Sequence, residues 1–296
     1  MSPTPPAAAT PLPPISRSAA MALAMNRAGL KLTSRMAPDL ARRWATHLFL
    51  KPPQHPHPGV EREWLARAES LAVTVRGRRV AAWRWGGAAP QGTVLLGHGW
   101  GGRGTQLHAF IAPLLDAGYG VATFDAPAHG FSESRYATML HFGQSIQAVA
   151  EAVGGVRAVI AHSMGGAATA LALDKQWLQT ERVVLISPPT DVEGYSRMFA
   201  KAMGVSEGVR QSMQRHLEKI YGFRWQDIEG GRLASRMRLP ALVIHDRNDR
   251  EVPLAAGERI ASHWSGAQFH VTEGLGHRRI LRDAGVVDMA VRFLGA

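Results

Sequence analysis

The sequence predicts an α/β fold: a mostly parallel, eight-stranded sheet with helices on both faces and a small helical insertion. Beyond residue 60, strand-like apolar runs alternate with helical patterns, and the later runs are continuously apolar, as in strands buried on both faces. Hydrophobic residues make up 46% of the 296 residues and charged residues 19%, which supports a sizeable core. One stretch, residues 188–239, has helical signals without a core strand and predicts the inserted cap.

The region before residue 60 has a different composition. Residues 1–17 are mostly Pro, Ala, Ser and Thr, which predicts a flexible tail. Residues 18–50 show an amphipathic helical pattern that Pro38 divides into two helices, and a Pro- and His-rich linker follows to residue 59. We expect this extension to pack against the main domain, residues 60–296; contact of residues 18–50 with an anionic membrane surface is the less favoured alternative.

The elements of the main domain follow from short apolar runs bounded by turn residues. The expected strands are 71–75, 80–85, 93–96, 120–124, 158–161, 183–186, 241–245 and 269–272, and the expected helices are 107–115, 138–153, 165–173 and 285–294. No stretch has the length of an apolar membrane span, and the first residues lack a secretory signal, so we expect a cytoplasmic protein.

Charge and cysteine content exclude several classes of function. The formal net charge is +11, but the basic residues are scattered arginines without a dense run or interleaved aromatic residues, so we expect no nucleic-acid partner. The chain has no cysteine, which excludes disulfides, thiolate metal sites and a cysteine nucleophile. We expect no cofactor and no metal site, and the sequence leaves the oligomeric state open.

The first chemical motif is Ala161-His162-Ser163-Met164-Gly165-Gly166, which follows an apolar strand and precedes a helix of small residues. This context is typical of a nucleophile elbow, a tight strand-to-helix turn that exposes a serine hydroxyl at the helix N-terminus. Small residues flank the serine because the turn brings them against neighbouring backbone. Ser163 is therefore the candidate nucleophile, although Ala161 stands where the motif usually has glycine.

Three further motifs follow other expected strands, whose carboxyl ends meet at one edge of a parallel sheet. The glycine-rich loop 97–102 can turn backbone N–H groups toward a reacting carbonyl oxygen. His277, in a glycine-containing loop after the last strand, is the candidate general base and acid. The third motif is the acidic loop 245–253, after the expected strand 241–245. It supplies the carboxylate that must orient this histidine. Asp249 in this loop is favoured; Asp246 in the same segment and Asp191, after the preceding strand, are the alternatives.

These motifs, in the order serine, acid, histidine, resemble the α/β-hydrolase superfamily. Residues 98–100 are similar to its His-Gly-x oxyanion loop, and residues 245–253 to its His-Gly-x-x-Asp-x-x-Val-Pro loop, with Asp246 in place of the glycine. The resemblance aligns Asp249 with the catalytic acid. It also implies an oxyanion hole made by the backbone N–H groups of Trp100 and Met164.

The resemblance implies acyl transfer, because family members that open epoxides or remove halogens have aspartate where this chain has Ser163. We therefore expect a serine hydrolase, carboxylesterase-like, that cleaves a carboxylic ester or thioester through an acyl-enzyme intermediate. A thioesterase, an acyltransferase and a carbon–carbon bond hydrolase are alternatives on the same triad. A hydrolase-fold binding protein is the alternative outside enzymes.

The substrate is expected to be a small molecule with an apolar acyl part, because the insertion is rich in apolar side chains. The sequence does not indicate its chain length. The expected substrate-binding residues are His98 and Gly99 in the glycine-rich loop, His162 in the elbow, and Met198 and Phe199 in the insertion.

Overall fold

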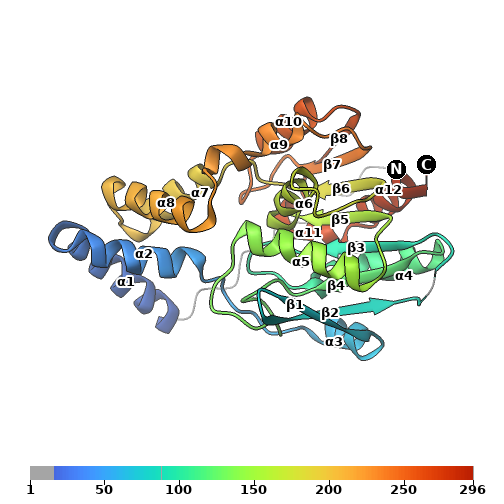
Figure 1. The fold of residues 1–296 in the computed structure, drawn as a ribbon, viewed down its shortest axis with the longest axis horizontal. Helices are drawn as coiled ribbons and strands as arrows, with labels where there is room; N and C mark the ends of the chain where they lie inside the picture. The colour runs from blue at the N-terminus through green and yellow to red at the C-terminus, as the bar shows by residue number, and fades with distance from the viewer. Residues whose placement is uncertain (1–16, 88, 296) are drawn as a thin grey trace, which may run out of the picture.

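Eight strands form a single sheet in the order β1-β2-β4-β3-β5-β6-β7-β8 (Figure 1). The computed structural model describes residues 17–87 and 89–295. The first two strands pair antiparallel with each other, β2 pairs antiparallel with β4, and all other pairs are parallel. The expected eight-stranded, mostly parallel sheet is therefore confirmed. The strands are β1 (Glu69–Val75), β2 (Arg78–Trp85), β3 (Thr93–Gly97), β4 (Gly120–Phe124), β5 (Ala158–His162), β6 (Arg182–Ile186), β7 (Ala241–Asp246) and β8 (Ala267–Thr272).

Helices cover both faces of the sheet, because successive residues of each buried strand point to opposite sides. Leu95 of β3 belongs to one apolar core and its neighbour Leu96 to another. The first core includes α5 (Met139–Ala152), α6 (Met164–Asp174) and α10 (Leu254–His263). The second includes η1 (Gly104–Phe110), α4 (Ile111–Asp116), η3 (Ile280–Arg282) and α12 (Ala284–Gly295), with α3 (Gly59–Ala66) at its edge.

The helix expected over residues 107–115 is divided into η1 and α4. The backbone of Leu107 leaves the helical region, with φ −90° and ψ 21°. A new helix starts at Ile111, and Pro113 lies in its first turn, where a missing N–H breaks no intrahelical hydrogen bond. The other three expected helices of the main domain, which became α5, α6 and α12, lie within two residues of their predicted bounds.

The helical insertion lies between β6 and β7, and residues 188–239, all of which are described, form no strand. It places helices at the edge of the sheet where β5 ends and α6 begins, beside the elbow (Figure 1). Its elements are α7 (Val192–Met203), α8 (Glu207–Tyr221), η2 (Trp225–Ile228) and α9 (Gly230–Ala234).

The N-terminal extension forms α1 (Arg17–Met36) and α2 (Pro38–Leu50), which are divided at Pro38 as expected. It packs against the insertion, since α1 contacts α7 and α2 contacts α8 (Figure 1). Leu30, Ala41 and Ala45 are fully buried there. Apart from Arg17, the tail predicted over residues 1–17 lies outside the described residues. Among the described helices, none combines the length and apolar character needed to span a membrane.

Candidate active site

Ser163 occupies the sharp turn between β5 and α6. Its φ of +51° lies in the left-handed region, which a non-glycine residue adopts only where the surrounding structure fixes it. The Ser163 backbone N–H donates to the Ile186 carbonyl on the neighbouring strand at 2.9 Å. A side chain at Gly165 would place its Cβ 2.6 Å from the His98 carbonyl oxygen, so glycine is required at this position. The chain thus presents the serine in a fixed turn at the N-terminus of α6.

Ala161, the departure from the usual elbow motif, is accommodated by its neighbour in the sheet. Ala161 pairs with Gly97 at the end of β3. A Cβ built on Gly97 would lie 3.3 Å from the Ala161 methyl carbon, tighter than an ordinary contact. The absence of a side chain at Gly97 therefore leaves the space that the extra methyl group of Ala161 occupies.

His277 lies in the short helix α11 (Gly276–Arg279), after β8, and is 8% exposed. Its Nδ1 donates to Asp249 Oδ2 at 2.7 Å. The other Asp249 oxygen accepts the backbone N–H groups of Glu251 and Val252 at 2.8 and 2.9 Å. Burial opposes ionisation of Asp249, but these hydrogen bonds outweigh it and lower its pKa to about 2. The carboxylate is thus ionised and aligned with the imidazole.

The two alternative acids lie elsewhere. Asp246 is fully buried and accepts hydrogen bonds from the Thr272 hydroxyl at 2.8 Å and the backbone N–H groups of Asn248 and Leu275 at 2.9 and 3.0 Å. It therefore ties the loop after β7 to the loop that carries His277. Asp191 is exposed and precedes α7. Of the three acids, Asp249 is the one hydrogen-bonded to His277.

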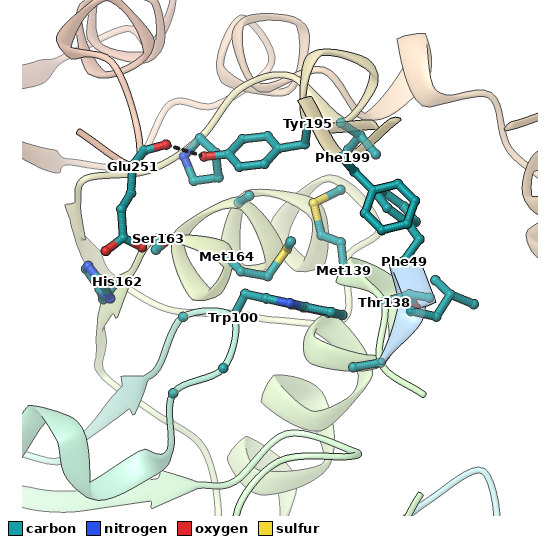
Figure 2. A pocket seen from close by; sticks show the side chains of 18 of the residues that line it. Phe49, Trp100, Thr138, Met139, His162, Ser163, Met164, Tyr195, Phe199 and Glu251 are labelled. Carbon is teal, nitrogen blue, oxygen red and sulfur yellow. Dashed lines mark hydrogen bonds between the residues drawn. The ribbon is translucent and has the colours of Figure 1, made fainter. Parts of the chain in front are cut away.

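A cavity of about 900 Å³ extends from Ser163 and His277 between the sheet edge, the helical insertion and the N-terminal extension. In Figure 2, Ser163 and Glu251 lie at one end, Phe49 and Phe199 at the other, and Met164, Met139 and Trp100 between them. This volume is at the upper end of the range for small-molecule sites. Its apolar lining includes Leu48, Phe49, Leu50, Trp100, Met139, Leu140, Met164, Tyr195, Met198, Phe199, Leu217, Tyr221, Phe223, Trp225, Ile228 and Leu233.

Four of the five expected substrate-binding residues, Gly99, His162, Met198 and Phe199, line this cavity. His98, the fifth, does not. It is absent from the described lining residues because its ring is fully buried beneath the loop. Its Nδ1 hydrogen-bonds to the Gly99 carbonyl at 2.7 Å, and its Nε2 accepts the Ala126 N–H at 2.9 Å. His98 therefore shapes the glycine-rich loop from behind.

His162 connects the elbow to the histidine loop. Its Nε2 donates to the His277 backbone carbonyl at 2.9 Å. Burial, reinforced by the nearby His277, lowers the pKa of His162 to about 3. The His162 ring is therefore neutral around pH 7 and holds the backbone of His277 next to the serine turn.

Phe49 and Glu251 line the cavity although the sequence did not indicate them as parts of the site, and Tyr195 lines it as one of the apolar residues of the insertion. Phe49 comes from α2 of the N-terminal extension, and its ring packs on Phe199. Glu251 places its carboxylate beside the imidazole of His277. Tyr195 donates from its hydroxyl to the Glu251 carbonyl at 3.2 Å, drawn as a dashed line in Figure 2. The one sequence signal was the apolar run Leu48–Leu50 directly before the Pro-rich linker.

Four arginines line the cavity: Arg103, which is mostly buried, and Arg278, Arg279 and Arg282, which are exposed. Arg278 is paired with Glu251 at 2.9 Å, and the side chain of Arg103 is paired with the buried Glu61. Among the described residues, no group of three or more His, Asp or Glu side chains is placed to hold a metal ion.

Residues 94–289, more than half of the chain, match the model of the Alpha/beta hydrolase family, and the chain therefore belongs to this family. Comparison with curated protein sequences gave no match. The family assignment agrees with the sheet topology and with the resemblance found in the sequence.

Solved structures of similar fold include enzymes of several activities. An esterase from Pyrococcus furiosus has a TM-score of 0.62 and 18% identity, with 83% of this chain and 98% of that chain covered. An esterase from Exiguobacterium antarcticum has a TM-score of 0.60 and 15% identity, with coverages of 77% and 99%. A meta-cleavage product hydrolase from Pseudomonas fluorescens has a TM-score of 0.56 and 16% identity, with coverages of 78% and 98%. At these identities the likeness shows the fold alone.

Proposed function

We propose that the protein is a serine hydrolase that cleaves a carboxylic ester or thioester through an acyl-enzyme intermediate. The observation that carries this proposal is the 2.7 Å hydrogen bond from His277 to the ionised Asp249, at a cavity that Ser163 also lines. An imidazole held at Nδ1 by a carboxylate has Nε2 free to accept a proton, which is the arrangement that activates a serine.

In the proposed reaction, the Ser163 oxygen attacks the carbonyl carbon while its proton passes to Nε2 of His277. The negative charge that develops on the carbonyl oxygen is stabilised by the backbone N–H groups of Trp100 and Met164, each worth about 3 kcal/mol in such a site. His277 then protonates the leaving alcohol or thiol as the carbon–oxygen or carbon–sulfur bond breaks. A water molecule, deprotonated by His277, then attacks the acyl carbon. The bond from the acyl carbon to the Ser163 oxygen breaks, His277 returns the proton to that oxygen, and the acid is released.

The glycine-rich loop and the elbow support this role for the backbone donors. Gly99 approaches the serine so closely that a Cβ there would lie 2.9 Å from the Ser163 Cβ. The residue that follows Gly99 is Trp100, and the residue that follows Ser163 is Met164. Both proposed donors thus belong to segments that meet at the nucleophile.

Labelling with a fluorophosphonate probe tests the proposal directly, because such probes react with activated serines. We expect the purified protein to be labelled and the Ser163→Ala variant not to be. Ser187→Ala is the matched control, since Ser187 is a buried serine at the end of the neighbouring strand β6. Absence of labelling in the folded wild-type protein would contradict the proposal and would favour a hydrolase-fold binding protein.

Thioesterases, acyltransferases and carbon–carbon bond hydrolases can use the same residues, so the bond that is cleaved needs a separate measurement. We expect turnover of p-nitrophenyl esters or of matched acyl thioesters in water alone. Turnover that requires an added alcohol or amine acceptor would instead identify an acyltransferase. Cleavage of a vinylogous diketone without cleavage of either ester type would identify a carbon–carbon bond hydrolase.

A further inference from the structure

The end of the cavity opposite Ser163 is built in part by the N-terminal extension, outside the segment that matches the family. The last turn of α2 contributes Leu48, Phe49 and Leu50 to the lining. The main-chain carbonyl of Leu50 accepts the N–H of Ala137, just before α5, at 2.9 Å. This hydrogen bond and the packing of α2 on α8 fix the turn relative to the sheet. The extension is therefore part of the cavity wall.

Phe49 lies at the centre of an aromatic cluster at this end. Its ring meets Phe199 of α7 edge-on, with the ring centroids 5.3 Å apart, and stacks on Trp225 of η2 at 6.0 Å. Such pairs contribute beyond the area that they bury, and they hold the rings in defined positions. The cluster joins three separate segments of the chain, so the position of Phe49 is set by tertiary packing on two sides.

The path from Ser163 to Phe49 is apolar. In Figure 2 the side chains of Met164, Met139 and Trp100 border the space between the two ends. At the far end, the Thr138 hydroxyl already accepts the His141 N–H as the cap of α5. The lining between the serine and the aromatic cluster thus offers thioether, indole and phenyl surfaces, which suit a chain of methylene groups.

We propose that the last turn of α2 is an acyl-chain stop: Phe49 closes an apolar acyl-binding site and sets the length of the unbranched acyl chain that the enzyme accepts. This inference rests on the proposed function, because it assumes that the acyl carbonyl is at Ser163. A chain that ends at the Phe49 ring buries each of its methylene groups, whereas a longer chain must displace the aromatic cluster.

Hydrolysis of p-nitrophenyl esters from acetate through butyrate, octanoate and laurate to palmitate tests the stop. We expect Phe49→Ala to move the maximum of kcat/KM to longer chains and Phe49→Trp to move it to shorter ones. Hydrolysis of the acetate, which does not reach Phe49, should stay within about twofold. Leu40→Ala is the matched control, because Leu40 lies on the same helix and is 57% exposed. Equal changes at all chain lengths in the Phe49 variants would overturn the proposal.

A binding measurement separates failure of the stop from failure of the proposed catalysis. Calorimetric titration of saturated fatty acids into Ser163→Ala should show affinity rising by up to about fourfold per added methylene until the chain reaches Phe49. We expect the plateau to come at a greater length in Ser163→Ala/Phe49→Ala. If Phe49→Ala does not fold, Phe199→Leu opens the same end from the other side. If the plateau in these variants comes at the same chain length as in Ser163→Ala, Phe49 is not the stop. This conclusion would hold even if the wild-type protein is labelled by the fluorophosphonate probe and hydrolyses esters.

Discussion

Glu251 Oε2 lies 4.0 Å from His277 Nε2, on the side of the imidazole away from Asp249. Arg278 holds this carboxylate through Nε at 2.9 Å. In the proposed mechanism His277 becomes positively charged in the transition state, so a nearby carboxylate stabilises that state. The Glu251 side chain is 48% exposed, however, so water screens its charge, and we expect the interaction to contribute about 0.2–1 kcal/mol, as for a surface ion pair.

Glu251→Gln should therefore lower kcat by about twofold to fivefold for an uncharged ester and leave KM unchanged. Steady-state kinetics at low ionic strength provide the measurement, and the effect should shrink as salt is added. Glu258→Gln is the matched control, because it removes the same charge from an exposed position on α10. A kcat equal to that of the wild type at low salt would show that the charge of Glu251 does not reach the imidazolium.

Asp249→Asn and Asp246→Asn should have different effects. Asp249→Asn removes the carboxylate that holds Nδ1 of His277, and we expect kcat of the folded protein to fall by about 10³–10⁴. In Asp246→Asn, whichever oxygen becomes an amide faces a backbone N–H, from Asn248 or Leu275. We expect this variant to lose about 1–3 kcal/mol of unfolding free energy and to keep kcat within about tenfold while folded.

The comparison requires kcat and thermal unfolding for both variants, with activity measured well below the lower Tm. A folded Asp246→Asn protein that has lost turnover, beside an active Asp249→Asn protein, would reverse the assignment of the orienting acid.

Gly165→Ala should disturb the elbow more than any other single methyl group added there. The new Cβ would lie 2.6 and 2.8 Å from the carbonyl oxygens of His98 and Gly97, and backbone atoms cannot move aside as a flexible side chain can. We expect a loss of about 1–3 kcal/mol in unfolding free energy and at least a tenfold loss of kcat/KM. Thermal unfolding and ester hydrolysis measure the two effects.

Gly208→Ala is the control for this substitution. In α8 no described atom lies within 4 Å of the added Cβ, and alanine favours a helix over glycine by about 0.5–1 kcal/mol. This variant should be as stable as the wild type or more stable. If Gly165→Ala behaved in the same way, the close approach of the elbow to β3 would not restrict the side chain at this position.

The sheet could be predicted from sequence because its central strands are buried on both faces, which leaves a continuous apolar run such as Ala158–Ala161 between turn residues. The elbow could be located for the same reason, since its position is fixed by the strand before it and the helix after it. The sequence could not show whether the elbow tolerates Ala161 in place of glycine. The residue that makes room for its methyl group, Gly97, lies on a strand far away in the sequence.

The rest of the site depends on contacts that no local pattern records. Asp246 ends β7 and Asp249 lies in the loop directly after it, and only the path of the backbone decides which carboxylate reaches His277. The contribution of Phe49 arises from the packing of α2 on the insertion. The amphipathic pattern of that segment indicated a helix with one buried face, but it gave no information about the surface that this face covers.

Buried histidines should make the protein sensitive to acid. Burial lowers the pKa of His129 to about 4 and that of His162 to about 3, below the ordinary value of 6.5. The folded state therefore binds fewer protons than the unfolded state between pH 6.5 and these values. The free energy of unfolding therefore decreases as the pH falls through this window. Each of the two histidines lowers it by about 1.4 kcal/mol per pH unit.

Asp125 acts in the opposite direction over part of the same range. Burial, against hydrogen bonds from the N–H groups of Phe131 and Gly104, raises its pKa from 3.8 to about 6. Its folded state therefore binds the proton more tightly, and this group favours folding increasingly as the pH falls from 6 to 3.8. The effect of Asp125 on the free energy of unfolding thus cancels that of about one histidine. His129, His162 and Asp125 together still lower the free energy of unfolding by about 1.4 kcal/mol per pH unit as the pH falls.

Denaturant unfolding at pH 7.5, 6.5, 5.5 and 4.5 should therefore show stability falling steadily below pH 6.5. His129→Gln removes one ionisable ring, and we expect its slope against pH to be smaller than that of the wild type by about 1.4 kcal/mol per unit. The exposed His55 provides the matched control, since His55→Gln changes the same residue type outside the core. A His129→Gln slope equal to that of the wild type would mean that His129 becomes protonated without unfolding the loop it supports through its 3.0 Å hydrogen bond from the Gly101 N–H.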